Sequence, residues 1–316
     1  MSPKNVNKAL ILAAGQGNRL RPFTNFVPKT MMPYKDKPLL YYQIERLRDV
    51  GINNIIIISR EDEDANGIFR FQNNYIKQLA NELKAYGTDI KIVYQKYDEN
   101  LKKPKGTADA LLSAEQYIDN SDYMVLLGDL LVENKENENQ NFLENILGEF
   151  TGDSLVSVKK VGLETAKGTW IVNSPTKESK KLLIEDIIEK PSEEEVRNYG
   201  NENDGFITTY NGTYIMSKNS LNYIKMTKPV RTDEIKIENS IALQAKDKKY
   251  SFYGVLINDN YYTIDFGDIN SWLSVNLSTE NTAKFTSALS SYPEGFREKV
   301  YEFTLERFNK DLKNYQ

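Results

Sequence analysis

Residues 10–42 read LILAAGQGNRLRPFTNFVPKTMMPYKDKPLLYY, and this order of apolar run, glycine loop and proline-rich arm decides the fold. The run from Ala9 to Ala13 is continuously apolar, which is typical of a strand buried on both faces of a parallel sheet. Gly15 and Gly17 follow directly, and glycines there let backbone N–H groups approach a phosphate closely. The segment therefore predicts a strand that carries a phosphate-binding loop at its carboxyl end.

Two cations accompany this loop. Arg19 and Lys29 flank the arm, and Pro28 and Pro33 stiffen the backbone on both sides of Lys29. A dinucleotide fingerprint would need glycine where Leu20 stands and a helix that the prolines block, and a Walker loop has no match in the chain. The combination favours cations aimed at a phosphate chain over a solvated surface loop.

The rest of the first half alternates between strands and helices. Buried strands are predicted at residues 55–58, 90–94 and 124–127, and helices at residues 38–50, 71–85 and 107–118. Such alternation predicts an α/β fold built on a doubly wound, mainly parallel (Rossmann-like) mixed sheet. Ligands of these sheets bind at the carboxyl ends of strands, where Gln95 and Gly128-Asp129 fall in this chain.

The second half is less regular and predicts a smaller α+β part. Its expected strands are residues 154–159, 169–172, 182–189, 208–216, 250–257 and 261–265, and its expected helices are residues 220–225, 235–245 and 268–278. Residues 132–141 (VENKENENQN) are expected to form a solvated acidic loop, and residues 287–293 a linker. No hexapeptide repeat follows, so no left-handed β-helix domain is expected.

A final helix carries an apolar stripe. We expect the stripe to pack on its own domain, with a dimer contact as the alternative; its members are Phe296, Val300, Phe303, Phe308 and Leu312. A homo-oligomer is therefore possible.

Composition excludes several chemistries. The 316 residues include 41 basic and 45 acidic side chains but no histidine and no cysteine, which removes catalytic triads, thiolates and imidazole metal ligands. The mild acidity argues against general nucleic-acid binding. No apolar run approaches the roughly 18 residues of a membrane span, and the polar first residues do not resemble a signal peptide. We therefore expect a cytoplasmic protein without a membrane partner.

Several later segments make the pattern specific. They are KGTADAL (105–111), LLGD (126–129), IIEKP (187–191), YNGTYI (210–215), RTDEIKIENSI (231–241) and YTIDFGD (262–268). With the opening segment, they occur in the order found in the sugar-1-phosphate nucleotidyltransferases, which the chain resembles over about residues 8–280. Within that family it is most similar to glucose-1-phosphate uridylyltransferases and thymidylyltransferases.

The resemblance implies a domain over residues 1–286 and a reaction. About residues 8–131 would bind the nucleotide, residues 150–280 the sugar phosphate, and residues 287–316 would form a helical extension. An NTP and a hexose-1-phosphate would give an NDP-sugar and pyrophosphate, by in-line attack of the sugar-phosphate oxygen on the α-phosphorus. Because a phosphate monoester has a second pKa of roughly 6, this nucleophile needs no general base. A ping-pong route through a uridylylated histidine is excluded, since the chain has none.

The resemblance also assigns residues. Arg19 and Lys29 would be catalytic and grip the triphosphate, and Asp129 and Asp265 would bind Mg²⁺. The implied nucleotide contacts are Leu12, Ala13, Ala14, Gly15, Gly17, Gln95, Gly106 and Thr107. Gln95 would read the base, and Gly106 would open a helix whose N-terminus is free to face the nucleotide. The implied sugar-phosphate contacts are Gly128, Gly168, Glu189, Lys190, Asn211 and Arg231.

The chain departs from the family pattern in three segments. Leu130 stands where an acidic or amide side chain is common, Lys167 replaces an aromatic residue beside Gly168, and Glu238-Asn239 replaces a Thr-Asp pair. UTP and glucose-1-phosphate are the expected substrates; dTTP, GTP or ATP are the alternatives. Two other classes stay open: a catalytically inactive nucleotide-sugar-binding regulatory protein, and a glycosyltransferase. The second would typically carry Asp-x-Asp at the metal, where this chain has Leu131.

Overall fold

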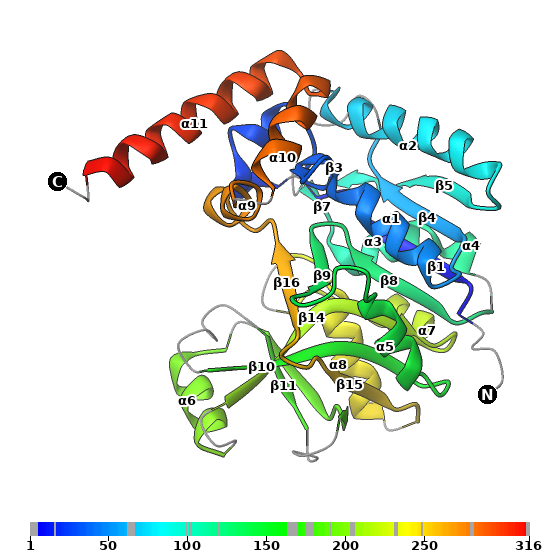
Figure 1. The fold of residues 1–316 in the computed structure, drawn as a ribbon. Helices are drawn as coiled ribbons and strands as arrows, with labels where there is room; N and C mark the ends of the chain where they lie inside the picture. The colour runs from blue at the N-terminus through cyan, green and yellow to red at the C-terminus, as the bar shows by residue number, and fades with distance from the viewer. Residues whose placement is uncertain are drawn as a thin grey trace.

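A computed structural model gives the fold of the chain (Figure 1). It describes residues 6–15, 17–61, 67–98, 100, 103–118, 120–162, 170–174, 180–189, 191–202, 206–230, 233–247, 249–278 and 281–313. Within these ranges, none of the helices combines the length and the apolar character needed to cross a bilayer.

An eight-stranded sheet forms the centre of the molecule. In spatial order its strands are β12 (Lys181–Leu183), β15 (Phe252–Leu256), β10 (Ser154–Gly162), β14 (Phe206–Met216), β8 (Tyr123–Leu127), β1 (Lys8–Leu12), β4 (Asn54–Ser59) and β5 (Asp89–Tyr94). The pairs from β8 to β5 are all parallel, whereas β14 is antiparallel to both of its neighbours. The predicted mixed, mainly parallel sheet is confirmed.

Helices cover both faces of this sheet because its central strands are apolar on both sides. Ala9 and Ile11 of β1 face a cluster that includes residues of α1 (Leu39–Asp49) and α2 (Ile68–Lys84). Leu10 faces the other cluster, which includes residues of α3 (Thr107–Ser113), α7 (Ser220–Met226) and α8 (Ile237–Asp247). Alternate side chains of one strand thus pack against helices on opposite faces of the sheet, which is the doubly wound arrangement.

Smaller elements complete the chain. Two-stranded sheets are formed by β2 (Pro33–Tyr34) with β3 (Lys37–Pro38), β6 (Tyr97–Asp98) with β7 (Lys103–Pro104), β9 (Leu130–Asn134) with β16 (Tyr261–Asp265), and β11 (Trp170–Asn173) with β13 (Asp186–Glu189). Further helices are α4 (Glu115–Ile118), α5 (Phe142–Glu149), α6 (Glu193–Glu202), α9 (Ile269–Asn276), α10 (Thr282–Ala288) and α11 (Glu294–Lys313). Short 3₁₀ turns are η1 (Asn18–Leu20), η2 (Phe23–Asn25), η3 (Lys29–Met31) and η6 (Leu289–Ser291).

The expected acidic loop over residues 132–141 is wrong at its start. Residues 132–134 belong to β9 and are buried against β16. Glu133, which is 2% exposed, accepts a hydrogen bond from the Tyr34 hydroxyl (2.6 Å) and lies 3.6 Å from the ammonium of Lys35. The neighbouring sequence predicts that this carboxylate is solvated, because the partners that bury it lie about a hundred residues earlier in the chain.

The expected linker over residues 287–293 is also wrong, since α10 and η6 occupy most of it and Tyr292 is buried. The α11 stripe packs on its own domain, as expected: Phe296 and Val300 are buried, and the ring of Phe303 lies 5.2 Å from that of Phe23. The side chains of Phe308 and Leu312 lie outside the described residues. Figure 1 shows the far end of α11 extending away from the body of the molecule.

Candidate active site

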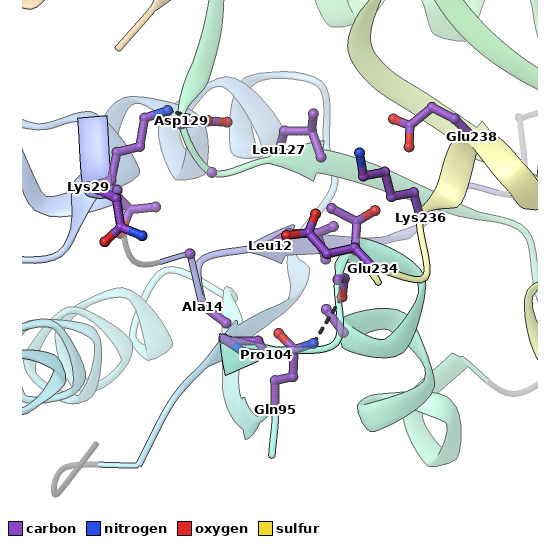
Figure 2. Close-up of a pocket in the computed structure, with 18 residues that line it drawn as sticks. Leu12, Ala14, Lys29, Gln95, Pro104, Leu127, Asp129, Glu234, Lys236 and Glu238 are labelled. Atoms are coloured by element: carbon purple, nitrogen blue, oxygen red, sulfur yellow. Dashed lines mark hydrogen bonds and ion pairs between the residues drawn. The ribbon is translucent and has the colours of Figure 1, made fainter. Parts of the chain in front are cut away.

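A pocket of about 390 Å³ lies at the carboxyl ends of β1 and β8 (Figure 2). Its lining brings together many of the residues assigned from the sequence: Leu12, Ala14, Gly15, Gly17, Lys29, Gln95, Gly106, Thr107, Gly128 and Asp129. It also includes Asn18, Thr30, Pro104, Ala110, Leu127, Glu234, Lys236 and Glu238. The expectation that function gathers at this edge of the sheet therefore matches the position of the pocket.

The backbone after β1 is held by its neighbours. Ala13 N–H donates to Ile58 O (2.8 Å), and Gly128 N–H donates to Leu12 O (3.0 Å). A Cβ atom at Gly128 would lie 2.4 Å from Leu12 O, so only glycine allows the two strand ends to come this close. The sequence placed Gly128 among the sugar-phosphate contacts, and here its backbone supports the loop after β1.

A buried polar network underlies the same loop. Gln72 of α2 is fully buried, and its amide nitrogen donates to Ala13 O (3.0 Å) and to the Ser59 hydroxyl (2.8 Å). Its amide oxygen accepts a hydrogen bond from the hydroxyl of Thr30, the neighbour of Lys29. One side chain thus ties the glycine loop to the cationic arm. Sequence reasoning missed it, because a polar residue within an amphipathic helix looks like part of a solvated face.

Lys29 is 9% exposed and pairs with the carboxylate of Asp129, with Nζ 2.5 Å from Oδ2. Gly17, at a φ of 66°, packs under it: a Cβ there would lie 3.0 Å from Lys29 Cβ and 3.0 Å from Thr24 Cγ2. The Thr24 hydroxyl also donates to Gly17 O (2.9 Å). The loop and arm therefore aim Lys29 at the pocket, whereas Arg19 is exposed and does not line it.

Asp129 lies in the turn before β9, and Asp265 ends β16, the strand that pairs with β9. Asp265 pairs in register with Leu130, and Phe266 N–H donates to Asp129 O (3.3 Å). Partial desolvation by the surrounding protein raises the pKa of Asp265, although its carboxyl keeps contact with solvent; the charge of Asp129 raises the pKa further, and those of Lys29 and Arg19 lower it. Asp129, Lys29 and Arg19 thus all lie close enough to Asp265 for their charges to affect its pKa.

Gln95 lies at the end of β5 and is 3% exposed. Its backbone N–H donates to Ser59 O (2.9 Å), and its side-chain nitrogen donates to Gly106 O (2.9 Å) and to Asp109 Oδ2 (2.9 Å). Sequence reasoning missed Asp109. Its position in the first turn of a helix suggests only a favourable interaction with the helix dipole.

A segment from the second half of the chain closes the pocket over α3. Ala108 N–H donates to Ile235 O (2.9 Å), Ile235 N–H donates to Lys105 O (2.6 Å), and Ile237 N–H donates to the Thr107 hydroxyl (3.0 Å). The expectation that the N-terminus of this helix is free to face the nucleotide is therefore wrong for Ala108, whose N–H is occupied by Ile235, although Gly106 and Thr107 do line the pocket. Gly106 makes the crossing possible: its φ is 120°, and a Cβ there would lie 2.6 Å from Ile235 O.

This crossing adds charged residues that sequence reasoning did not assign, although they lie within the RTDEIKIENSI motif. Glu234, Lys236 and Glu238 line the pocket, and the carboxylate of Glu238 accepts a hydrogen bond from the Tyr214 hydroxyl (2.7 Å). In Figure 2, Lys236 and Glu238 lie on the opposite side of the pocket from Lys29 and Asp129. The pocket is thus charged on two sides.

The residues assigned to the sugar phosphate are described in part. Gly168, Lys190 and Arg231 lie outside the described residues, as do the side chains of Glu189 and Asn211. The backbone of Glu189 ends β13, and the register of β14 against β10 shifts around Asn211. Gly212, at a φ of 72°, lies against Leu130: a Cβ there would be 2.4 Å from Leu130 Cδ1. The backbone at this bulge therefore lies close to Leu130, the residue that follows Asp129.

Comparison with known proteins defines the class. A family model described as nucleotidyl transferase matches residues 8–282, and the chain belongs to this family, in its sugar-1-phosphate nucleotidyltransferase branch. Members of this branch transfer a nucleotidyl group to a sugar-1-phosphate.

The names of individual similar proteins are more specific than the description of the family. The chain is 30% identical over 256 residues to the UTP–glucose-1-phosphate uridylyltransferase of Staphylococcus haemolyticus, a match that covers 77% of this chain and 83% of that protein. It is similar in fold to a UDP-glucose pyrophosphorylase crystallised with UDP-glucose (TM-score 0.68, 24% identity, 89% of this chain and 99% of the other). It is also similar to the UTP-bound UGPase of Acinetobacter baumannii (TM-score 0.67, 19% identity, 95% and 99%).

Proposed function

We propose that the chain transfers the uridylyl group of UTP to glucose-1-phosphate, which yields UDP-glucose and pyrophosphate. The names of the relatives support this choice of substrates within the family. The observation that carries the proposal is the ion pair of Lys29 with Asp129 beside a glycine loop at the pocket wall. Asp265 is not among the lining residues of the pocket, but it lies close enough to Asp129 and Lys29 for their charges to affect its pKa.

The reaction requires charge neutralisation and alignment rather than proton removal. The sugar phosphate is already ionised at neutral pH, so its oxygen attacks the α-phosphorus directly and pyrophosphate leaves on the opposite side. Lys29 is held by the loop at the pocket wall and would neutralise charge at the α-phosphorus. Arg19 is exposed nearby and would bind the outer phosphates, for which a guanidinium fork is suited.

The two acidic residues are suited to a hard divalent cation, for which we propose Mg²⁺. Asp129 lies just before β9, and Asp265 ends its partner strand β16. Burial raises the pKa of Asp265 and the charge of Asp129 raises it further, a repulsion that a cation would relieve. Among the described residues no third acidic side chain joins them, which suits Mg²⁺, since it usually takes one or two carboxylates and keeps water and phosphate as its other ligands. When bound, the ion would neutralise charge on the phosphates.

The base and the sugar would occupy different walls. We place the base against the backbone of Leu12 and Ala14 with Gln95 at its edge, since these three residues line the pocket. Ala13, which the sequence assigned to the nucleotide, is not among the lining residues, and its backbone N–H and carbonyl are bonded to Ile58 and Gln72. The sugar phosphate would bind Lys190 and Arg231, and the sugar hydroxyls would bind Glu189, with Gly168 and Asn211 close to the ring. These last roles rest on the family resemblance.

A substrate panel tests the proposal. Purified protein with Mg²⁺ is supplied with UTP, dTTP, GTP, ATP or CTP, each with glucose-, galactose- or mannose-1-phosphate, and pyrophosphate release is measured. We expect UTP with glucose-1-phosphate to give the highest kcat/KM. A higher value for dTTP would identify a thymidylyltransferase instead, and the absence of pyrophosphate with every pair would contradict the enzymatic proposal.

A further inference from the structure

Gln43 is a buried polar residue in the middle of α1. Its side chain is 1% exposed, and its amide nitrogen donates two hydrogen bonds of 2.7 Å, one to Leu127 O and one to Leu130 O. These two acceptors lie 84 and 87 residues later in the chain. A single side chain of α1 is thus bonded both to the end of β8 and to the start of β9.

The two carbonyls enclose the turn that carries Asp129. The residues between Leu127 and Leu130 are Gly128 and Asp129, and both of them line the pocket. The backbone bonds described above hold Gly128 to β1 and Asp129 to the residue after β16, so each of them uses a group inside the turn. The amide of Gln43 instead ties the two ends of the turn to one fixed donor, and this determines how far apart the ends lie.

The partners of the Gln43 amide determine its orientation. A carbonyl oxygen can only accept hydrogen bonds, so the NH₂ end must face Leu127 and Leu130. The amide oxygen then has no donor among the described residues. Gln43 lines a cavity of about 20 Å³, together with Arg46 and Thr213, and this volume is large enough for one water molecule. Both amide hydrogens are therefore committed to the turn, and the oxygen is left to the cavity.

The same face of α1 also holds the rest of β9. Arg46, one turn after Gln43, donates to Glu138 O (2.7 Å) and lies 3.7 Å from the carboxylate of Glu133. Residues three apart share one face of a helix, so both side chains meet β9 and the loop that follows it. The helix α1 is therefore a support for the strand whose partner, β16, ends at Asp265.

We propose that Gln43 is a positioning residue that fixes the turn of Gly128 and Asp129, and so keeps the Asp129 carboxylate at the pocket wall where it would hold the divalent cation. This inference rests on the proposed function and concerns the precision of that same site. A metal ligand loses affinity when the groups that orient it are removed. Gln43 does not line the pocket, so it acts on substrates only through the turn.

The test replaces Gln43 by methionine, which has a similar length but cannot donate. In hydrogen exchange followed by mass spectrometry, peptides that cover residues 127–130 should exchange about tenfold faster in Gln43→Met than in the wild type, because the turn has lost two hydrogen bonds. In titration calorimetry, the Kd of UTP with Mg²⁺ should rise about tenfold, while the Kd of UTP with EDTA should stay within twofold. The ratio of these two Kd values isolates the contribution of the metal.

Gln244→Met is the matched control. Gln244 is also 1% exposed, and its amide nitrogen also donates to two backbone carbonyls, Tyr250 O (3.4 Å) and Ser251 O (3.2 Å), but it does not line the pocket. This variant should also lower Tm, yet it should leave both the exchange of residues 127–130 and the ratio of Kd values unchanged. A merely structural role of Gln43 would make the two variants behave alike.

The outcomes are distinguishable. Unchanged exchange of residues 127–130 in Gln43→Met, or an unchanged ratio of Kd values, would overturn the inference. If Gln43→Met does not fold, Gln43→Asn serves in its place: its amide is one methylene shorter and cannot reach both carbonyls, so it should give a smaller change in the same direction, and no change would overturn the inference.

A failure of the proposed function has a different signature. If the wild-type protein releases no pyrophosphate with any substrate pair, the proposed reaction fails, whereas the exchange rates and the Kd values still test the role of Gln43. If Mg²⁺ does not change the Kd of UTP for the wild-type protein, both the proposed metal site and this inference are overturned.

Discussion

The part of the molecule that we propose binds the nucleotide and the part that we propose binds the sugar phosphate are built differently. On the nucleotide side, the candidate residues follow strands of one parallel array, and the loop backbone is bonded to Ile58, Gly128 and Gln72. On the sugar side, Glu189 ends a strand of a separate two-stranded sheet, and Asn211 lies at a bulge in an antiparallel strand. The residues proposed to handle phosphate thus follow parallel strands of the central sheet, whereas the residues proposed for the sugar lie on a separate two-stranded sheet and on an antiparallel strand of the central sheet.

The largest expected effect concerns the cation of the nucleotide side. Lys29→Ala removes the ammonium at the pocket wall, and we expect kcat to fall by about 10²–10³-fold, as for loss of one group that stabilises transition-state charge. Steady-state pyrophosphate release measures this. Lys37→Ala, an exposed lysine near the same arm, is the control and should stay within twofold of wild type. A decrease in kcat of less than tenfold for Lys29→Ala would mean that Lys29 does not supply the main positive charge that stabilises the transition state.

The next effect tests the junction between the two sides. Gly106→Ala places a Cβ 2.6 Å from Ile235 O at a φ of 120°, so we expect a loss of about 2–3 kcal/mol in the free energy of unfolding. Urea denaturation measures it. Gly162→Ala is the matched control, because a Cβ there meets nothing within 4 Å. Equal stability of the two variants would show that the crossing of residues 234–238 over α3 is not tight.

A smaller effect distinguishes the sugar side directly. Glu189→Gln should raise KM for glucose-1-phosphate by about tenfold, since one charged hydrogen-bond acceptor for sugar hydroxyls is lost, and it should leave the Kd of UTP unchanged. Initial rates over a range of sugar-phosphate concentrations, combined with calorimetry for UTP, separate the two. A weakened UTP interaction with unchanged KM for the sugar would reverse the assignment of the two sides.

The smallest expected effect concerns the stability of the unliganded protein. The pKa of Asp265 is raised above 3.8 in the fold, so its charged form destabilises the folded state at pH values above that raised pKa, and the penalty disappears as the pH falls through it. Asp265→Asn should therefore give a small increase in Tm at pH 8, measured without metal or nucleotide, and no increase near pH 4. A Tm that decreases at pH 8 would mean that the carboxylate is stabilised by its neighbours.

The sequence predicts the parallel half well, because its signals are local. Apolar runs such as Ile55–Ile58 mark buried strands, and the glycines and prolines around Lys29 mark a fixed loop. Gly128 and Asp129 follow directly from the strand before them. Each of these features depends on residues within about ten positions of one another, so a single chain displays it.

Contacts between distant segments could not be predicted in this way. The burial of Glu133 depends on Tyr34 and Lys35, and the blocking of the α3 N-terminus depends on Ile235, which lies more than a hundred residues later. The hydrogen bonds of the Gln95 side chain to Gly106 and Asp109 likewise join residues that lie more than ten positions apart. The periodicity of a segment reports which face is buried but not which partner buries it, and this is why these features emerged only from the structure.

The ion pair between Lys29 and Asp129 has a consequence for how substrates enter. While the two side chains satisfy each other, a bare divalent cation would have to compete with an ammonium for the carboxylate, and an uncomplexed triphosphate would have to compete with a carboxylate for the ammonium. A nucleotide that arrives already chelated brings both counter-charges at once. When such a complex binds, each of the two side chains exchanges its partner for a new one of opposite charge. Binding of the metal–nucleotide complex is therefore favoured over separate binding of the metal and the nucleotide.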